Sequence, residues 1–207
     1  MRTSSRSLVR AGASIRLRSA EPPLRGEAKL EAALVAFAID VRGRIALDLG
    51  AAAGGFTRVL LRHGARRVYA VDAGHGQLVG SLRQDARVVV LERTNLAELT
   101  PTLVPDELDL VTVDLSYLSL AAAIPQLSGR VRLASACDLV ALVKPQFELG
   151  LAQPLRTTSE AVRRATKAIE AAGWRVVAAI DSPVAGRRGA VEALVHATRV
   201  PSCASTS

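Results

Sequence analysis

Polar residues stand at the ends of several apolar, strand-like runs in this sequence. Asp72, Asp114 and Lys144 each come directly after a run rich in Val, Leu and Ala. A carboxylate at such a position can accept hydrogen bonds from the hydroxyl groups of a sugar. An aspartate beside a lysine holds the ammonium by charge-assisted hydrogen bonds, although isolated ion pairs of this kind are also common without a chemical role. These strand ends are therefore the first candidates for a site.

A glycine-rich segment follows the first apolar run, where residues 48–57 read DLGAAAGGFT. Glycines let the backbone approach a ligand closely, and the N-terminus of a following helix supplies N–H donors. The glycines lie at positions 50, 54 and 55, which is not the G-x-G-x-x-G spacing of a dinucleotide dehydrogenase. The segment predicts a ligand-binding turn of another kind, and a purely structural turn is the alternative.

Two strand ends extend this candidate site toward a nucleoside. A carboxylate at Asp72 is placed to accept both ribose hydroxyls of an adenosine, a feature that nucleotide sites share. Residues 92–95, Glu-Arg-Thr-Asn, end a third run and place polar groups within reach of an adenine. A solvated loop is the alternative for this last segment.

The elements that must position these residues alternate between strand and helix. Strands are expected over residues 44–49, 67–71, 88–91, 108–113, 138–143, 175–180 and 191–197. Helices are expected over 27–38, 55–63, 76–84 and 157–172, with a further one ending near 127. Apolar strands that alternate with helices predict an α/β, doubly wound, mostly parallel seven-stranded sheet whose last strand runs antiparallel. Ligands bind such sheets beyond the carboxyl ends of the strands.

Composition narrows the class of partner. The formal net charge is +8 and only three of the 27 basic residues are lysine, at 29, 144 and 167. This charge favours a polyanionic partner such as RNA, and Arg-rich codon usage is the alternative.

The two cysteines, 137 and 203, lie far apart and suggest a reducing cytoplasm, and no apolar run is long enough to span a membrane. Residues 1–23 predict a basic, flexible arm and residues 200–207 a flexible tail around one domain over 24–199.

In combination, these motifs resemble those of the FtsJ-like RNA 2′-O-ribose methyltransferases. The resemblance covers residues 24–199 and is carried by residues 48–57, by the segments VYAVD (68–72), GHGQL (74–78) and LERTN (91–95), and by DLSYLS (114–119) and LVKPQFE (142–148). The combination is specifically similar to the TlyA branch, which comprises rRNA methyltransferases, some of them also described as haemolysins. The resemblance implies S-adenosylmethionine as cofactor, rRNA or a ribosomal subunit as partner, and no metal.

The resemblance also assigns residues. It implies a catalytic Lys-Asp-Lys-Glu tetrad at Lys29, Asp114, Lys144 and Glu192. In this assignment, Lys144 orients a ribose hydroxyl or accepts its proton. The cofactor-binding residues that it implies are Asp48, Gly50, Ala51, Gly54, Gly55, Phe56, Thr57, Asp72, Asn95, Asp114 and Tyr117.

The sequence departs from the family pattern mainly on the substrate side. A basic segment stands where the TlyA branch carries a small N-terminal RNA-binding domain, and Glu27 replaces the second glycine of a Gly-Gly pair. Residues 150–155 replace a Gly- and Val-rich stretch, and Ala190 replaces an asparagine. Two alternatives therefore stand beside rRNA methylation: O-methylation of a small hydroxylated metabolite, and a catalytically weakened RNA-binding paralogue.

Overall fold

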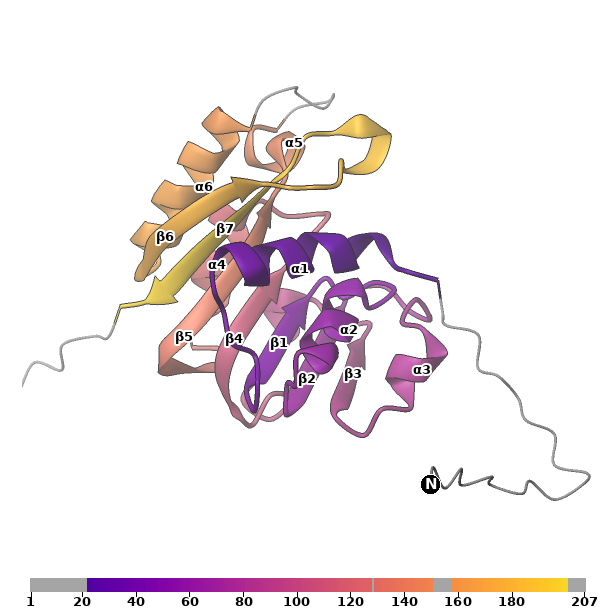
Figure 1. Cartoon of the computed structure of the whole chain (residues 1–207). Helices are drawn as coiled ribbons and strands as arrows, with labels where there is room; N and C mark the ends of the chain where they lie inside the picture. Colours follow the sequence, from indigo (N-terminus) through magenta and orange to yellow (C-terminus); the bar gives the residue numbers. More distant parts are fainter. Residues whose placement is uncertain (1–21, 128, 151–157, 201–207) are drawn as a thin grey trace, which may run out of the picture.

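A seven-stranded sheet with strand order β3-β2-β1-β4-β5-β7-β6 forms the centre of the computed structural model (Figure 1). The structure describes residues 22–127, 129–150 and 158–200, so the predicted arm and tail fall almost entirely outside the described residues. Strands β1 to β5 run parallel, and β7 lies antiparallel between β5 and β6, as the sequence predicts. The strands are β1 (Ile45–Leu49), β2 (Arg67–Asp72), β3 (Val88–Glu92), β4 (Glu107–Val113), β5 (Arg132–Val143), β6 (Trp174–Asp181) and β7 (Ala193–Arg199).

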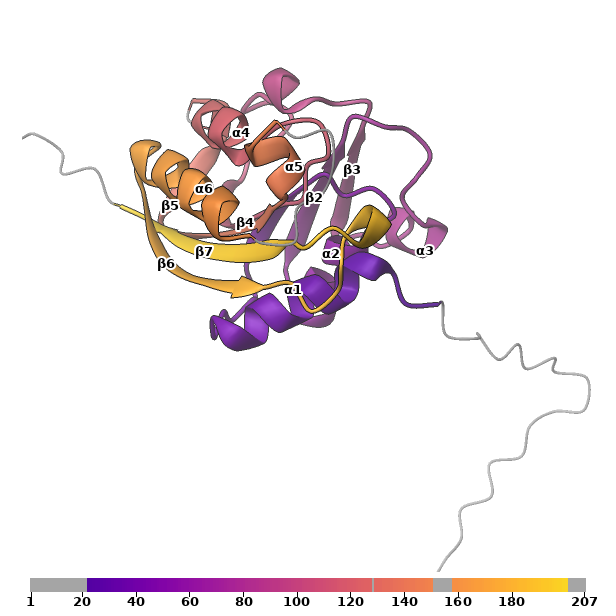
Figure 2. The ribbon, with the colours of Figure 1, turned by 90° about the horizontal axis from the view of Figure 1, so that it is seen from above.

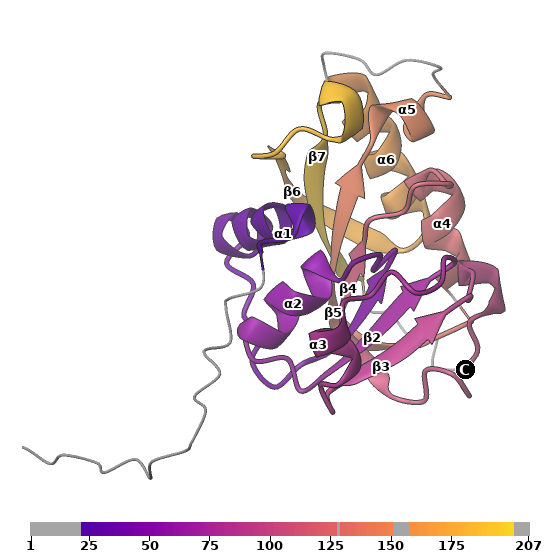
Figure 3. The ribbon, with the colours of Figure 1, turned by 90° about the vertical axis from the view of Figure 1, so that its right-hand side faces the viewer.

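Helices cover both faces of the sheet, which confirms the doubly wound class. Figures 2 and 3 show α1 to α3 on one face and α4 to α6 on the other. The helices are α1 (Arg25–Ala36), α2 (Gly55–Arg62), α3 (Gly80–Arg83), α4 (Leu120–Leu127), α5 (Pro145–Glu148) and α6 (Ser159–Ala171), with single 3-10 turns at Leu96–Glu98 and Arg187–Gly189. No helix among the described residues has the length and apolar character needed to cross a membrane.

Each face of the sheet has its own apolar core. In β1, Ile45, Leu47 and Leu49 pack into the core shared with α4 and α6, whereas Ala46 packs into the core shared with α1 and α2. This division follows from the alternation of side chains along a strand. Because all five residues of β1 are buried, the strand end that carries the glycine-rich segment is anchored on both sides.

The structure corrects several element boundaries. Helix α3 occupies only 80–83 of the predicted 76–84, because the N–H groups of residues 76–78 donate to the Glu92 carboxylate. Strand β7 begins at Ala193 rather than at 191, so Glu192 lies in the loop before the strand. Strand β5 begins at Arg132, earlier than the predicted 138. The one-turn helix α5 was not predicted, because four residues are too few to show helical periodicity.

Candidate active site

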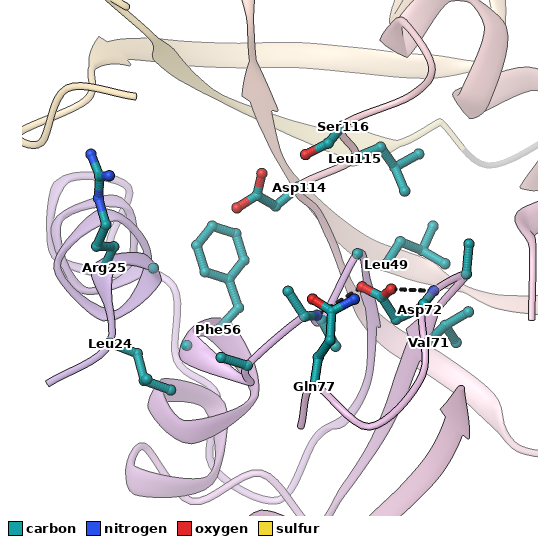
Figure 4. A pocket seen from close by; sticks show the side chains of 18 of the residues that line it. Leu24, Arg25, Leu49, Phe56, Val71, Asp72, Gln77, Asp114, Leu115 and Ser116 are labelled. Carbon is teal, nitrogen blue, oxygen red and sulfur yellow. Dashed lines mark hydrogen bonds between the residues drawn. The ribbon is translucent and has the colours of Figure 1, made fainter. Parts of the chain in front are cut away.

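A cavity of about 860 Å³ opens at the carboxyl ends of the parallel strands. Its walls come from the segments after β1, β2, β3, β4 and β5, from the start of α1 and from the β6–β7 loop. Figure 4 shows Phe56, Asp72 and Asp114 around the same space, with Leu24 and Arg25 of the α1 region to one side. The cavity therefore lies where doubly wound sheets bind ligands.

The β1–α2 loop passes very close to the end of β4. Gly50 has φ +85°, and a Cβ built on it would lie 2.4 Å from the carbonyl oxygen of Asp114. The Asp114 N–H donates to the Leu49 carbonyl at 2.8 Å, so the two strand ends are joined backbone to backbone. Only glycine fits this contact, which lets the β1–α2 loop lie directly against the end of β4.

Asp72 lines the cavity and is held by backbone N–H groups. Its Oδ2 accepts from Ala52 N at 2.8 Å and its Oδ1 from Gly74 N at 2.7 Å (Figure 4). A carboxylate has about four acceptor positions, so this arrangement leaves capacity for two hydroxyl groups. Gln77, which the sequence analysis did not assign, also lines the cavity and lies beside Asp72.

Glu92 organises the loop beside Asp72 rather than facing an adenine. Its carboxylate accepts from the N–H groups of residues 76, 77 and 78 and pairs with Arg83. The Arg83 guanidinium and the Gly76 N–H hold the pKa of Glu92 at about 2. Of residues 92–95, only Thr94 lines the cavity, so only Thr94 stays a candidate for contact with an adenine.

Four residues expected at the cofactor lie outside the cavity wall, namely Asp48, Gly54, Thr57 and Asn95. Gly54 packs under the Leu78 and Leu82 side chains, and Asn95 is exposed at the start of the 3-10 turn 96–98. Asp48 precedes the last residue of β1, so its side chain faces α2 instead of the crevice. The sequence could have indicated this, because Asp48 shares its face of β1 with Ala46.

Asp48 is completely buried behind the loop. Its Oδ2 accepts from the Thr57 hydroxyl at 2.6 Å and its Oδ1 from the Thr112 hydroxyl at 2.9 Å. Burial raises the pKa of Asp48 to about 6, although the two hydroxyl groups act to lower it. Asp48 and Thr57 therefore bind α2 to the central strands and support the loop from below.

Lys144 reaches across from β5 to the segment after β4. Its Nζ pairs with Asp114 Oδ1 at 2.6 Å and donates to the Leu115 carbonyl at 2.9 Å and to Ser116 Oγ at 3.1 Å. Only the Leu115 and Ser116 oxygens accept hydrogen bonds from the ammonium, because Asp114 Oδ1 contacts it as an ion pair without hydrogen-bond geometry; together the three contacts fix the direction of the side chain. The predicted pairing of Asp114 with Lys144 is present, and both residues line the cavity.

Lys29 and Glu192 form a second, more buried pair on the same cavity wall. Lys29 Nζ donates to Glu192 Oε2 at 2.5 Å, and the two side chains are 9% and 6% exposed. The β6–β7 loop passes close to this carboxylate, because a Cβ on Gly186 would lie 2.2 Å from Glu192 Oε1. Such burial of a single charge is costly, so each residue depends on the other.

Helix α1 is held in place by the residue that departs from the family pattern. Glu27 accepts from the Leu24 N–H at 2.8 Å and pairs with Arg58 at 2.8 Å and with Arg62 at 3.0 Å. Although burial acts to raise it, the Leu24 N–H and the two guanidinium groups hold the pKa of Glu27 below its usual value. Glu27 thereby joins α1 to α2, two residues before Lys29.

The structure brings all four residues of the expected tetrad, Lys29, Asp114, Lys144 and Glu192, to one cavity. Of the expected cofactor residues, Gly50, Ala51, Gly55, Phe56, Asp72, Asp114 and Tyr117 also line it. Arg25 and Ser116 line the same wall and were not assigned from the sequence. Within the described part of the chain, no group of His, Cys, Asp and Glu side chains is arranged to hold a metal ion.

Comparison with known proteins identifies the family. Residues 24–199 match the model of the FtsJ-like methyltransferase family. The 16S/23S rRNA (cytidine-2'-O)-methyltransferase TlyA of Mycobacterium tuberculosis is 48% identical over 81% of this chain and 65% of its own length. A proposed rRNA methyltransferase of Bacillus subtilis, YqxC, is 38% identical over 83% of this chain and 64% of its own. This chain thus spans just under two thirds of the length of these relatives.

A solved structure is similar to this chain in both fold and sequence. A proposed hemolysin from Streptococcus thermophilus superposes with a TM-score of 0.79 at 36% identity, over 92% of this chain and 70% of that chain. The family match covers every residue of the tetrad and every residue of the cavity wall except Pro23. The chain therefore belongs to the FtsJ-like methyltransferase family.

Proposed function

We propose that this protein transfers a methyl group from S-adenosylmethionine to a ribose 2′-hydroxyl of RNA, with ribosomal RNA as substrate. The observation that carries the proposal is the convergence of two lysine–carboxylate pairs, Lys144 with Asp114 and Lys29 with Glu192, on one cavity. The activity for which the Mycobacterium tuberculosis relative is named supports the same acceptor.

The cavity wall suits S-adenosylmethionine on the side of β1 and β2. At Gly50 no side chain stands between the loop and the end of β4, so a ligand can lie close to the backbone there. Asp72 is placed to accept hydrogen bonds from the ribose hydroxyls. Leu96 and Leu115 supply apolar surface for an adenine, and Gln77 lies beside Asp72. When bound, S-adenosylmethionine supplies an electrophilic methyl group carried on a sulfonium.

The two lysines act on the acceptor hydroxyl in this proposal. A ribose hydroxyl is a weak nucleophile while it keeps its proton, and nearby positive charge favours the deprotonated oxygen. Lys144 is oriented by Asp114 and Ser116 and contacts the hydroxyl oxygen, while Lys29 adds a second positive charge. As the bond from the methyl group to this oxygen forms and the bond from the methyl group to sulfur breaks, the hydroxyl proton leaves to solvent water. Asp114 and Glu192 reduce the repulsion between the two ammonium groups. Fixed orientation of the acceptor supplies much of the acceleration.

A product analysis tests the acceptor. Ribosomal subunits or their RNA are incubated with S-adenosylmethionine carrying a labelled methyl group, digested to nucleosides and examined by mass spectrometry. The proposal expects label in 2′-O-methylnucleosides. Label in base-methylated nucleosides, or transfer to small hydroxylated compounds but not to RNA, would contradict it.

Two binding measurements test the ligands separately. Calorimetric titration is expected to show binding of S-adenosylmethionine and none of NAD, whereas binding of NAD alone would overturn the cofactor assignment. The logarithm of RNA affinity is expected to fall linearly with the logarithm of salt concentration, because phosphate contacts release counterions. An RNA affinity independent of salt would argue for the small-molecule alternative.

A further inference from the structure

Glu148, in helix α5, is a buried carboxylate that lies outside the cavity wall. Glu148 is 2% exposed, and its Oε1 accepts a hydrogen bond from the backbone N–H of Leu120 at 2.6 Å. Oε2 is also buried and has no hydrogen-bond partner among the described residues. Burial raises the pKa of Glu148, while the Leu120 N–H, the charge of Arg164 on α6 and the Ala121 N–H act to lower it. The reaction proposed above does not use this carboxylate.

Glu148 lies in the helix that follows Lys144, and it binds the start of the helix that follows the segment of Asp114. Lys144 immediately precedes α5, and its carbonyl accepts from Glu148 N at 3.1 Å. Leu120, the partner of Glu148, begins α4 directly after the segment 114–119. Lys144 therefore holds the start of this segment through Asp114, Leu115 and Ser116, and Glu148 holds its end.

An ordinary helix cap would not need a buried charge from another element. A local cap is already present, because Ser119 Oγ accepts from Ala122 N at 3.2 Å. A buried carboxylate costs desolvation free energy that a surface cap avoids. The distinguishing property of Glu148 is that it links α5 to α4, the two elements that follow Lys144 and Asp114.

We propose that Glu148 is a positioning residue, which fixes the segment 114–120 against α5 so that Asp114 and Ser116 stay in register with Lys144. The inference rests on the proposed function, since it assigns a catalytic consequence to this register. A displacement of catalytic groups by about 1 Å can lower turnover by about 100-fold. Loss of the Glu148 link is therefore expected to lower kcat by a larger factor than it raises the Kd for S-adenosylmethionine, to which the same segment contributes Leu115.

The test compares three variants of the full chain in the rRNA methylation assay. Glu148→Leu removes the acceptor and is expected to lower kcat by about 10- to 100-fold, and to raise the Kd for S-adenosylmethionine by a smaller factor of about two to five, because Leu115 lies in the same segment. Glu148→Gln keeps an oxygen that can accept from Leu120 N–H and is expected to restore most of kcat. Ser119→Ala removes the local cap of the same helix, so it lowers the melting temperature without a comparable loss of kcat.

Two results would overturn the inference: wild-type kcat in Glu148→Leu, or equal losses of kcat in Glu148→Leu and Ser119→Ala at equal loss of melting temperature. If Glu148→Leu does not fold, Glu148→Asp replaces it, because the shortened side chain keeps its charge but not its reach.

Amide hydrogen exchange separates this inference from the proposed function. Exchange over residues 114–121 is measured without RNA, and it is expected to be faster in Glu148→Leu or Glu148→Asp and near wild type in Glu148→Gln. Unchanged exchange in Glu148→Leu and in Glu148→Asp would refute the link even if methylation were confirmed. Absence of RNA methylation by the wild type would refute the proposed function, and the catalytic role of Glu148 with it.

Discussion

The two sides of the cavity are built in different ways. The side that we assign to the cofactor consists mainly of backbone, with Gly50 against the Asp114 carbonyl and Asp72 held by two N–H groups. The side that we assign to the acceptor consists of long charged side chains from α1, β5 and the loops after β4 and before β7. The first depends on local chain geometry, and the second depends on how four distant segments pack.

This difference predicts different responses to substitution. Backbone geometry tolerates changes in neighbouring side chains, whereas a buried ion pair fails when one partner is removed. Substitutions on the acceptor side are therefore expected to abolish turnover or stability, and those on the cofactor side to weaken ligand binding.

The largest effect is expected for Lys144→Ala. The variant removes the group that contacts the hydroxyl, so kcat is expected to fall by about 10³-fold. Calorimetric titration is expected to give an unchanged Kd for S-adenosylmethionine, because Lys144 lies on the other side of the cavity. Near-normal turnover by this variant would exclude Lys144 from the mechanism. It would also contradict the expectation that substitutions on the acceptor side abolish turnover.

Glu192→Ala tests the dependence of the acceptor side on its buried pair. The variant leaves the Lys29 ammonium buried without its partner, so the free energy of unfolding is expected to fall by about 3 kcal/mol in denaturant titration. The double variant Lys29→Met, Glu192→Leu is expected to recover most of this stability and no activity. If the double variant were as unstable as Glu192→Ala, unpaired charge would not be the cause.

Asp48→Asn examines the support beneath the cofactor loop through its pH dependence. The pKa of Asp48 is raised in the folded state from 3.8 to about 6, so protonated Asp48 favours folding below that range. The stability of the wild type relative to Asp48→Asn should thus fall by an amount on the order of 3 kcal/mol as the pH rises from about 4 to about 7. Parallel stability curves for the two proteins, measured by denaturant titration, would contradict the raised pKa.

The smallest effect is expected for Asp72→Asn. An amide has one oxygen where the carboxylate has two, so one backbone N–H or one ligand hydroxyl loses its acceptor. The Kd for S-adenosylmethionine is expected to rise about tenfold, and kcat at saturating cofactor to change little. A loss of kcat without a change in Kd would place Asp72 with the acceptor side instead.

Predictions from the sequence succeeded where they depended on the carboxyl ends of parallel strands. Asp72, Asp114 and Lys144 each end or follow a strand, and all three line the cavity. Asp48 was predicted to be a cofactor-binding residue. In the structure it lies one residue before the end of β1, and strand alternation turns its side chain away from the cavity toward Thr57 on α2. The role of Glu92 was not predictable, because its donors come from a loop more than ten residues earlier.

By itself, the sequence determined the doubly wound class and the glycine-rich turn after β1, because these follow from local periodicity and residue type. Its resemblance to the FtsJ-like family supplied the four residues of the two pairs. Only the tertiary structure decided that Lys29 lies at 2.5 Å from Glu192, 163 residues away, and that Glu148 reaches the N-terminus of α4. Such contacts depend on the packing of α1 beside β7 and of α5 beside α4. Packing of this kind is set by the whole core, and no local pattern encodes it.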